Sequence, residues 1–413
     1  MRLKSYMNIK IKRQISLALL LFFISGAVFS KSKLEIFQAK IDSIVATVNY
    51  STSIQIVSAD KYDVLYSYKP QTKMIPASIS KLVTSVAGLA YLGPGYEFKT
   101  IIYTDDINIS DGVINGNLYI KGYGDPDLNS NDIRYLAKNI LGKGITSITG
   151  NVIYDESFLD NSYYSLAEYY SNDTKKQYWP YVNALALDKN SGRYNPASSA
   201  AELLAGELQS GNVQFGGIVV AGVTPTGAKQ ITDISHSMFD VMAFMNKTSD
   251  NHSAITMFKV IGAKYKGAPG TLEKGQEAVN DLLVGMGNSR SSFEILEGSG
   301  LTRYNMVTSD MYIRMLKYMY DDEKNFDFFY RTLAIAGKDG TLSKRMIGTE
   351  AEGNIHAKTG TINSVSCLAG YAVSRENELI IFYIAMNGFG GGNGMPRQKQ
   401  DDICEIICQF SRK

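Results

Sequence analysis

Apolar and polar positions alternate in several short stretches of this chain, and elsewhere the apolar positions form longer runs. Residues 52–57 and 63–68 are rich in β-branched and aromatic residues and flank a polar turn, which predicts a β-hairpin. The apolar run 82–89 that follows is typical of a buried helix. Near the end of the chain the same patterns predict two strands and a closing helix, at residues 366–373, 378–387 and about 398–410.

The middle of the chain has a different pattern of apolar and polar residues: short strand-like stretches are separated there by turns that contain Gly, Asp and Asn. These stretches are residues 99–103, 117–121, 151–154 and 213–220. Helical periodicity returns over residues 239–258. A chain of 413 residues is long enough for two or three domains. We therefore predict a catalytic domain in two parts, residues 31–95 and 232–413, with a strand-rich domain inserted at 96–231.

The first 30 residues stand apart from the rest. Five basic residues precede an apolar run from Ile15 to Phe29, and Val28 and Ser30 fit the small positions before a cleavage site. This pattern predicts a signal peptide, and hence an exported, periplasmic protein. The run is short for a membrane span, although a retained N-terminal anchor is the alternative. Without this segment 37 basic residues face 40 acidic ones, a net charge of −3, which gives no indication of nucleic-acid binding.

Three cysteines, Cys367, Cys404 and Cys408, are the only ones in the sequence. An odd number in an exported chain leaves at least one thiol free or in an intermolecular bond. We predict that they are buried, small apolar residues. No group of cysteines and histidines has the spacing of a metal site, and we predict neither a metal nor a cofactor.

Three short strings carry the candidate chemistry: Ser78-Ile79-Ser80-Lys81, Ser249-Asp250-Asn251 and Lys358-Thr359-Gly360. Each is weak alone, since Ser-x-x-Lys also occurs at 30–33 and 58–61. The first string has a distinctive context, because Pro76 precedes it and an apolar helical run follows. In this order the three strings are the set that class A β-lactamases and penicillin-binding proteins share.

The first and second strings supply a nucleophile and its proton carriers. A serine hydroxyl needs a base before it can attack a carbonyl, and none of the three histidines is required for this. Lys81 lies one helical turn beyond Ser78, and burial together with the second cation at Lys358 would favour its neutral form. Ser249 can relay a proton to the leaving amine, whereas Asp250 is predicted to be structural. Whether Lys81 or a water-mediated network takes the first proton stays open.

The remaining motif residues suit substrate binding. Asn251 offers an amide both to the base and to a substrate carbonyl. A cation and a hydroxyl side by side, Lys358 and Thr359, suit a substrate carboxylate, and we expect them on an edge strand along which the substrate pairs. The backbone N–H groups of Ser78 and Thr361 are the expected oxyanion donors.

Together these strings resemble the DacB-type D-alanyl-D-alanine carboxypeptidase/endopeptidase family of low-molecular-mass penicillin-binding proteins. Further matching strings are Gly122–Pro126, Lys247–Asn251, Gly298–Asn305, Gly337–Leu342 and His356–Thr361. The resemblance implies an α/β (α+β) fold, with a β-lactamase/transpeptidase-like domain whose antiparallel sheet is covered by helices, and an inserted domain. It also implies that peptidoglycan stem peptides are the substrate, that β-lactams acylate Ser78, and that Arg303 and Asp155 contact the diamino acid of the stem. For those last two residues, loop salt bridges are the alternative.

Two features depart from the family pattern, and a third adds to it. Glu297 stands where the family usually has Asp, and the insertion is short, which affects substrate preference more than chemistry. A tyrosine-rich run could stack on glycan, with packing as the alternative; it comprises Tyr163-Tyr164, Tyr169-Tyr170 and Tyr178-Trp179.

The predicted function is a serine-type D-Ala-D-Ala carboxypeptidase, with DD-endopeptidase activity, that works through an acyl-enzyme. A β-lactamase is one alternative, although no Glu-x-x-x-Asn string follows soon after Ser78. The other is a non-catalytic penicillin-binding receptor or scaffold, which could keep the three motifs for acylation alone.

Overall fold

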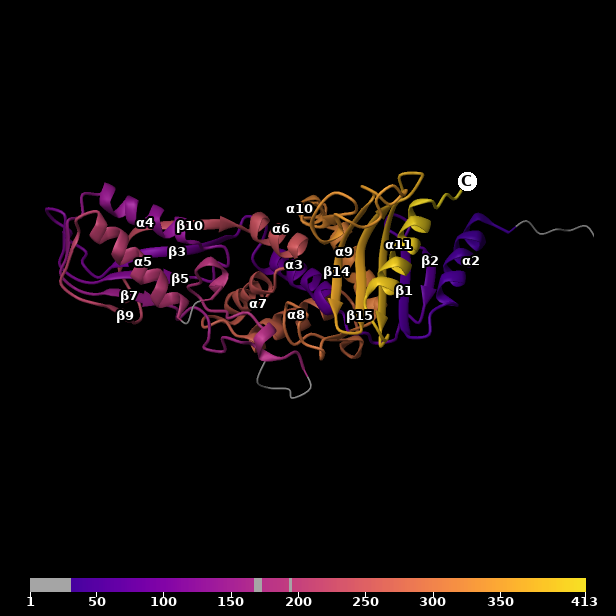
Figure 1. Cartoon of the computed structure of the whole chain (residues 1–413), viewed down its shortest axis with the longest axis horizontal. Coiled ribbons are helices and arrows are strands. Elements are labelled where there is room, and N and C mark those ends of the chain that lie inside the picture. Colours follow the sequence, from indigo (N-terminus) through magenta and orange to yellow (C-terminus); the bar gives the residue numbers. More distant parts are fainter. Residues whose placement is uncertain (1–30, 167–172, 193–194) are drawn as a thin grey trace, which may run out of the picture.

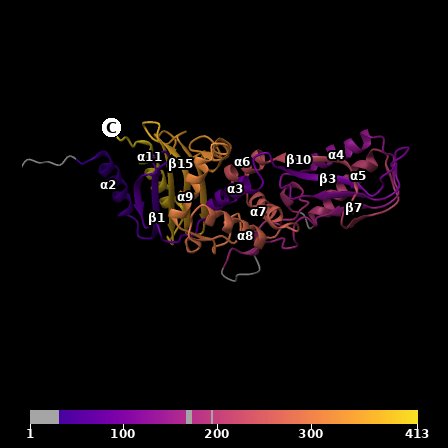
Figure 2. The same ribbon diagram turned by 180° about the vertical axis from the view of Figure 1, so that it is seen from behind.

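The computed structural model describes residues 31–166, 173–192 and 195–413. The molecule is elongated, with a six-stranded sheet at one end and a five-stranded sheet at the other (Figure 1). Helices α3 (Ser80–Tyr91), α6 (Met238–Thr248), α7 (Asn251–Lys266) and α8 (Leu272–Gly285) lie between the two sheets in both views (Figures 1 and 2).

The six-stranded sheet joins the two ends of the chain. Its order is β13-β14-β15-β16-β1-β2, and all neighbours are antiparallel. The strands are β13 (Ala334–Ile335), β14 (Ile355–Ile362), β15 (Val365–Val373), β16 (Leu379–Asn387), β1 (Ser51–Ser58) and β2 (Val64–Tyr68). The predicted hairpin and the two predicted C-terminal strands are thus confirmed, with shifts of at most one residue at their ends.

Helices cover both faces of this sheet, so its central strands are buried on both sides. Along β16, Ile380 and Phe382 pack into one core with helices α2 (Lys33–Val45) and α11 (Gly394–Cys408). The alternate residues, Ile381 and Tyr383, pack into the other core with α3 and α9 (Ser309–Asp321). This period of two is that of a pleated strand. Apolar and polar residues do not alternate along this strand, because both faces of the sheet are covered and neither meets water.

The five-stranded sheet has the order β10-β3-β5-β7-β9. Its strands are β10 (Lys229–Ser237), β3 (Glu97–Thr104), β5 (Leu118–Gly122), β7 (Val152–Asp155) and β9 (Val219–Ala221). The first three are antiparallel and the last three parallel. Parallel neighbours need a crossover, and helices α4 (Ser130–Gly142) and α5 (Pro196–Ser210) supply it while packing on the sheet. The middle segment is therefore mixed α/β and less strand-rich than expected.

One expectation for this segment needs correction. The strand expected over 213–220 is split into β8 (Gln214–Phe215) and β9, because a close approach at Gly216 interrupts it. A Cβ atom at Gly216 would lie 2.2 Å from the carbonyl oxygen of Thr149. The expected domain boundary at 231/232 falls inside β10, which pairs with β3 as far as Ser237. The division into two domains stays a prediction.

Several short elements complete the described fold: β4 (Val113–Ile114), β6 (Ser147–Ile148), β11 (Phe293–Glu294), β12 (Met306–Val307) and α10 (Phe326–Arg331). Cys367, Cys404 and Cys408 are free and buried, as predicted. Within the described ranges no helix combines the length and the apolar character needed to cross a membrane. The predicted signal peptide, residues 1–30, lies outside the described residues.

Candidate active site

Ser78 lies at the N-terminal end of α3, in a short 3-10 turn from Ala77 to Ile79. It is half-buried, whereas every residue from Ser80 to Leu89 is buried. Ala77 has a φ of +48°, an unfavourable conformation for a residue with a Cβ atom. Such strain persists only where the surroundings determine it, and it is common at functional sites.

Two glycines allow neighbouring segments to close on this turn. A Cβ atom at Gly300 would lie 1.9 Å from the Ala77 carbonyl oxygen, and one at Gly360 would lie 2.4 Å from the Pro76 carbonyl oxygen. The loop around Gly300 and strand β14 can therefore approach the nucleophile turn from two sides. The glycine of the Lys358-Thr359-Gly360 motif is thus required by the protein's own packing.

Lys81 is fully buried beneath Ser78 and has three polar neighbours. Its Nζ lies 3.1 Å from Ser78 Oγ, 2.7 Å from Asn251 Oδ1 and 2.7 Å from the Ser299 carbonyl oxygen. The last two oxygens can only accept hydrogen bonds, so a neutral amine directs its two N–H groups to them. Its lone pair is then left for the Ser78 hydroxyl, which is the arrangement a general base requires.

The electrostatic surroundings of Lys81 favour this role. Burial lowers the pKa of Lys81 to about 8, while the carboxylates of Glu297 and Asp250 act in the opposite direction. Burial also lowers the pKa of Lys358 well below its ordinary value, and the nearby charge of Lys81 adds to this effect. A neutral amine is therefore accessible near neutral pH, as the sequence predicted.

Glu297 organises the loop that presents Ser299 to Lys81. Its buried carboxylate accepts hydrogen bonds from Ser299 N–H and Oγ–H at 2.6 Å and from Gly300 N–H at 2.7 Å. Burial raises the pKa of Glu297, although these donors oppose the shift. The longer Glu side chain therefore fills the place of the usual Asp. Sequence reasoning missed the role of Ser299, and the Gly-Ser-Gly-Leu string was the signal that could have shown it.

The Ser249-Asp250-Asn251 string forms a turn between two helices. Residues 239–258 were expected as one helical stretch, but α6 ends at Thr248, and Ser249 has left-handed angles, φ 64° and ψ 37°. Asp250 caps α7 by accepting a hydrogen bond from Ser253 N–H at 2.7 Å, which confirms its structural role. Helical periodicity did not reveal this break, because apolar positions on both sides of the turn face the same core.

The two flanking residues of this turn differ in their contacts. Asn251 Oδ1 faces Lys81, so its Nδ2 remains available for a substrate carbonyl. The Ser249 hydroxyl makes no hydrogen bond with any residue that the structure describes, and it lines a cavity of about 760 Å³ together with Asn251. The structure does not place Ser249 in hydrogen-bond contact with Lys81. Its role as a proton relay stays a prediction.

Strand β14 carries the third motif at a free sheet edge. Its neighbour β13 pairs only with His356 and Ala357, so from Lys358 onward the described strand has a partner on one side alone. Lys358 is fully buried and donates to the Thr359 carbonyl oxygen at 2.9 Å. The Thr359 hydroxyl contacts Thr341 Oγ1 at 2.8 Å. The expectation of an edge strand is confirmed for this stretch.

Arg303 and Thr361 lie close to the motif residues. Arg303 donates from its guanidinium to the Asn363 carbonyl oxygen at 2.9 Å. With Asn251 it lines a cavity of about 690 Å³. Thr361 Oγ1 accepts a hydrogen bond from Arg397 at 3.4 Å. The structure thus brings Arg303 to the region of the second motif.

Asp155 has partners of its own in the five-stranded sheet and lines neither of the two cavities described above. Its buried carboxylate forms an ion pair with Lys121 at 3.0 Å and accepts hydrogen bonds from Ser157 N–H at 2.9 Å and Thr224 N–H at 2.7 Å. It stands at the end of β7 in the five-stranded sheet, where its oxygens are already paired. These contacts fit the salt-bridge alternative, and a contact of Asp155 with substrate stays a prediction. The motif around Asp155 could not show these contacts, because a short stretch of sequence reveals neither the burial of a side chain nor its partners.

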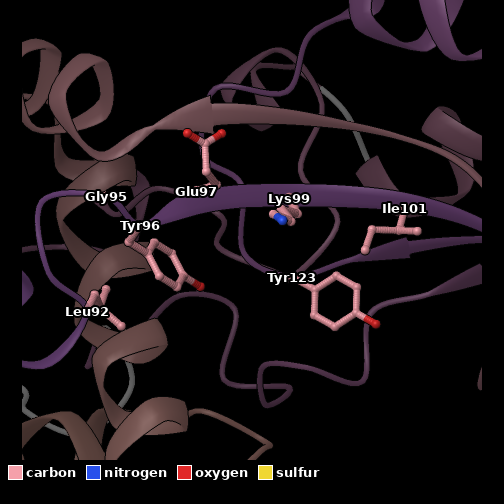
Figure 3. Close-up of a pocket in the computed structure, with 7 residues that line it drawn as sticks. All are labelled: Leu92, Gly95, Tyr96, Glu97, Lys99, Ile101 and Tyr123. Carbon is pink, nitrogen blue, oxygen red and sulfur yellow. The ribbon is translucent and has the colours of Figure 1, made fainter.

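One further cavity lies apart from the predicted site residues. A cavity of about 480 Å³ lies beside the C-terminal end of α3, with Tyr96 and Tyr123 pointing toward it (Figure 3). None of the predicted site residues lines it. In the tyrosine-rich run, Trp179 is buried and Tyr163 stacks on Tyr181, which fits the packing alternative. Tyr164, Tyr178 and Trp179 also line the cavity that contains Ser249, so stacking on glycan stays a prediction. Tyr178 is 62% exposed, and Tyr169-Tyr170 lie outside the described residues.

Comparison with known proteins decides the family. The model of the D-Ala-D-Ala carboxypeptidase 3 (S13) family matches residues 37–194 and 192–409. The chain belongs to this family. It is 24% identical to D-alanyl-D-alanine carboxypeptidase DacB of Haemophilus influenzae, over 83% of this chain and 86% of the relative. It is 25% identical to a D-alanyl-D-alanine carboxypeptidase of Actinomadura sp., over 87% of this chain and 81% of the relative.

Solved structures support the fold of this S13 chain. Penicillin-binding protein 4 (dacB) of Haemophilus influenzae matches with a TM-score of 0.78 and 21% identity, over 90% of this chain and 99% of that one. A penicillin G-acylated predatory endopeptidase of Bdellovibrio bacteriovorus matches with a TM-score of 0.56 and 18% identity, over 87% and 94%. The predicted fold class is confirmed. The chain is an enzyme, a hydrolase of the D-Ala-D-Ala carboxypeptidase kind.

Proposed function

We propose that this S13-family chain is a serine-type D-Ala-D-Ala carboxypeptidase and DD-endopeptidase that cleaves peptidoglycan stem peptides through an acyl-enzyme on Ser78. One observation carries the proposal: the buried amine of Lys81 directs its N–H groups to two carbonyl-type oxygens and faces the Ser78 hydroxyl at 3.1 Å. This arrangement activates a serine without histidine.

Acylation begins when Ser78 Oγ attacks the carbonyl carbon of the penultimate D-alanine and Lys81 accepts the hydroxyl proton. The oxyanion lies against the backbone N–H groups of Ser78 and Thr361, and loss of one such donor typically costs about 3–4 kcal/mol of transition-state stabilisation. The C–N bond then breaks, and the leaving amine takes a proton through Ser249. Free D-alanine departs, and the peptide remains as an ester on Ser78.

Deacylation repeats this chemistry with water as the nucleophile. Lys81 accepts a proton from the water as it attacks the ester carbonyl, and the proton returns to Ser78 Oγ when the ester bond breaks. The products are the shortened peptide and the regenerated enzyme. Each cycle consumes one water and changes no oxidation state, so no redox cofactor is required.

Substrate binding follows from the free edge of β14. An extended peptide can pair with this strand by β-augmentation, with Asn251 Nδ2 on a peptide carbonyl and the hydroxyl of Thr359 beside Lys358 on the terminal carboxylate. The cavity that contains Arg303 would receive the diamino-acid side chain. The cavity of about 760 Å³ at Ser249 leaves room for a leaving group larger than D-alanine, which supports activity on cross-links.

Two further parts of the proposal rest on the relatives and on the N-terminal pattern. Since a similarly folded endopeptidase is acylated by penicillin G, we propose that β-lactams acylate Ser78. The basic and apolar pattern of residues 1–30 supports export to the periplasm, where peptidoglycan is the substrate of such enzymes.

The deciding experiment incubates the purified protein with a pentapeptide that ends in D-Ala-D-Ala and measures free D-alanine. We expect release by the wild type and none by Ser78→Ala. Intact-mass spectrometry after penicillin treatment should show a long-lived adduct on Ser78. Rapid penicillin turnover without an adduct would indicate a β-lactamase. Normal acylation without any release of D-alanine would indicate a receptor.

A further inference from the structure

Lys189 lies outside the three motifs but reaches the turn that carries the second one. Its Nζ donates to Ser253 Oγ at 2.9 Å and lies 3.7 Å from Asp250 Oδ1. It also forms an ion pair with Asp127, and it stands 4.6 Å from the centre of the Phe244 ring. The side chain therefore connects the segment before α5 with the N-terminal end of α7.

The backbone at Lys189 is held in a conformation that L-residues rarely adopt. Asp188, Lys189 and Asn190 have φ angles of 49°, 55° and 57°. The flanking side chains fix this turn: Asp188 accepts hydrogen bonds from Ser130 N–H and Oγ–H, and Asn190 Oδ1 accepts one from Leu187 N–H at 2.9 Å. Strain that the surroundings enforce in this way often accompanies function. Here it directs the lysine toward the catalytic turn.

The contacts of Lys189 continue directly to the proposed base. Asp250, which faces Lys189, caps α7, and the next residue, Asn251, accepts a hydrogen bond from Lys81 at 2.7 Å. Three links thus join Lys189 to the reacting amine: the ion pair with Asp250, the backbone from Asp250 to Asn251, and the hydrogen bond between Asn251 and Lys81. Loss of the lysine would release one side of the turn and leave the Asp250 charge without its nearest cation.

We propose that Lys189 is a positioning residue, which holds the Ser249-Asp250-Asn251 turn in register with Lys81 and balances the charge of Asp250. This inference rests on the proposed function. Lys189 also lines the cavity that contains Ser249. No hydrogen bond joins it to Ser78 or Lys81 among the described residues, so the proposed effect on the reacting amine passes through Asp250 and Asn251.

The charged groups around both amines set the expected direction of a pH effect. Lys189 faces Asp127 and Asp250, and burial lowers the pKa of neighbouring His252 to about 4, so that this imidazole is neutral near pH 7. Around Lys81, the carboxylates of Glu297 and Asp250 raise its pKa, and Lys358 is the second buried amine. Without the Lys189 cation, the negative charge of Asp250 is no longer partly neutralised. It then stabilises the protonated form of Lys81 more strongly, so the pKa of Lys81 should rise.

The test measures the rate of penicillin acylation against pH by intact-mass spectrometry for the wild type, Lys189→Met and Lys189→Arg. We expect Lys189→Met to lower the rate at pH 7 by about tenfold or more, since small misplacements of reacting groups have large effects. Its pH midpoint should move upward by about half a unit. Lys189→Arg should restore most of the rate. Lys138→Met, an exposed lysine on α4, is the matched control and should behave as wild type.

Several outcomes would overturn the inference. An equal rate and midpoint in Lys189→Met and wild type would do so, as would a loss that Lys189→Arg does not restore. If Lys189→Met does not fold, the test uses Asp127→Asn, which removes the carboxylate that pairs with Lys189. A wild-type acylation rate in Asp127→Asn would refute the positioning role of Lys189. Absence of acylation in the wild type would instead refute the proposed function itself.

Discussion

Replacement of Lys81 by alanine separates catalysis from stability more clearly than any other change. A positioned general base contributes about 10²–10⁴-fold to a rate, which is about 3–5 kcal/mol at 1.36 kcal/mol per factor of ten. Since no second base faces Ser78 Oγ among the described residues, we expect Lys81→Ala to lose acylation to this extent.

The stability of Lys81→Ala follows from two opposing effects. Burial depresses the folded-state pKa of Lys81 from 10.5 to about 8. The unfolded chain therefore binds more protons between these values, and stability rises with pH across that window. Below about pH 8 the buried amine costs the folded state about 3 kcal/mol. The variant removes this cost but leaves Asn251 Oδ1 and the Ser299 carbonyl without their donor, at about 1–3 kcal/mol each. The net change should lie within about 2–3 kcal/mol of zero.

The assay combines urea unfolding at pH 7 with acylation by a fluorescent penicillin. Lys259→Ala is a matched control, since Lys259 is also fully buried but pairs with Asp160 at 2.7 Å, away from the motifs. That variant should lose about 3–5 kcal/mol of stability and keep its acylation chemistry when folded. A folded Lys81→Ala protein that is acylated within tenfold of the wild-type rate would refute the assignment of Lys81 as the base.

Four further predictions concern residues around the site. Gly300→Ala should destabilise the protein by at least about 2 kcal/mol and abolish acylation, because its Cβ would meet the Ala77 carbonyl oxygen; unchanged acylation rates would contradict this packing. Glu297→Gln removes a charge that raises the pKa of Lys81, so the pH midpoint of acylation should fall, and an upward shift would contradict this reasoning. Asp155→Asn should cost about 3 kcal/mol in urea unfolding and leave kcat/KM for stem peptides unchanged; a selective fall in kcat/KM would restore it as a substrate ligand. Arg303→Ala should lower kcat/KM about tenfold for peptides that contain a diamino acid and spare penicillin acylation, whereas an equal loss for both would place Arg303 in the catalytic machinery.

The local sequence determined the chemistry of the site. Ser78 and Lys81 are separated by one helical turn, and that spacing alone brings a hydroxyl and an amine onto the same face of a helix. The hairpin of β1 and β2 and the strands β15 and β16 were also readable, because short-range patterns of side chains report strand propensity. These features depend on residues that are near one another in the chain.

Only the tertiary structure decided which distant groups complete the site. The Ser299 carbonyl oxygen, which faces Lys81, comes from a segment more than 200 residues away. The sheet that contains β7 pairs Asp155 with Lys121, and a strained turn brings Lys189 to Asp250. Such contacts form when hydrophobic burial packs the elements together. Their partners are set by the geometry of packing, which no short stretch of sequence encodes.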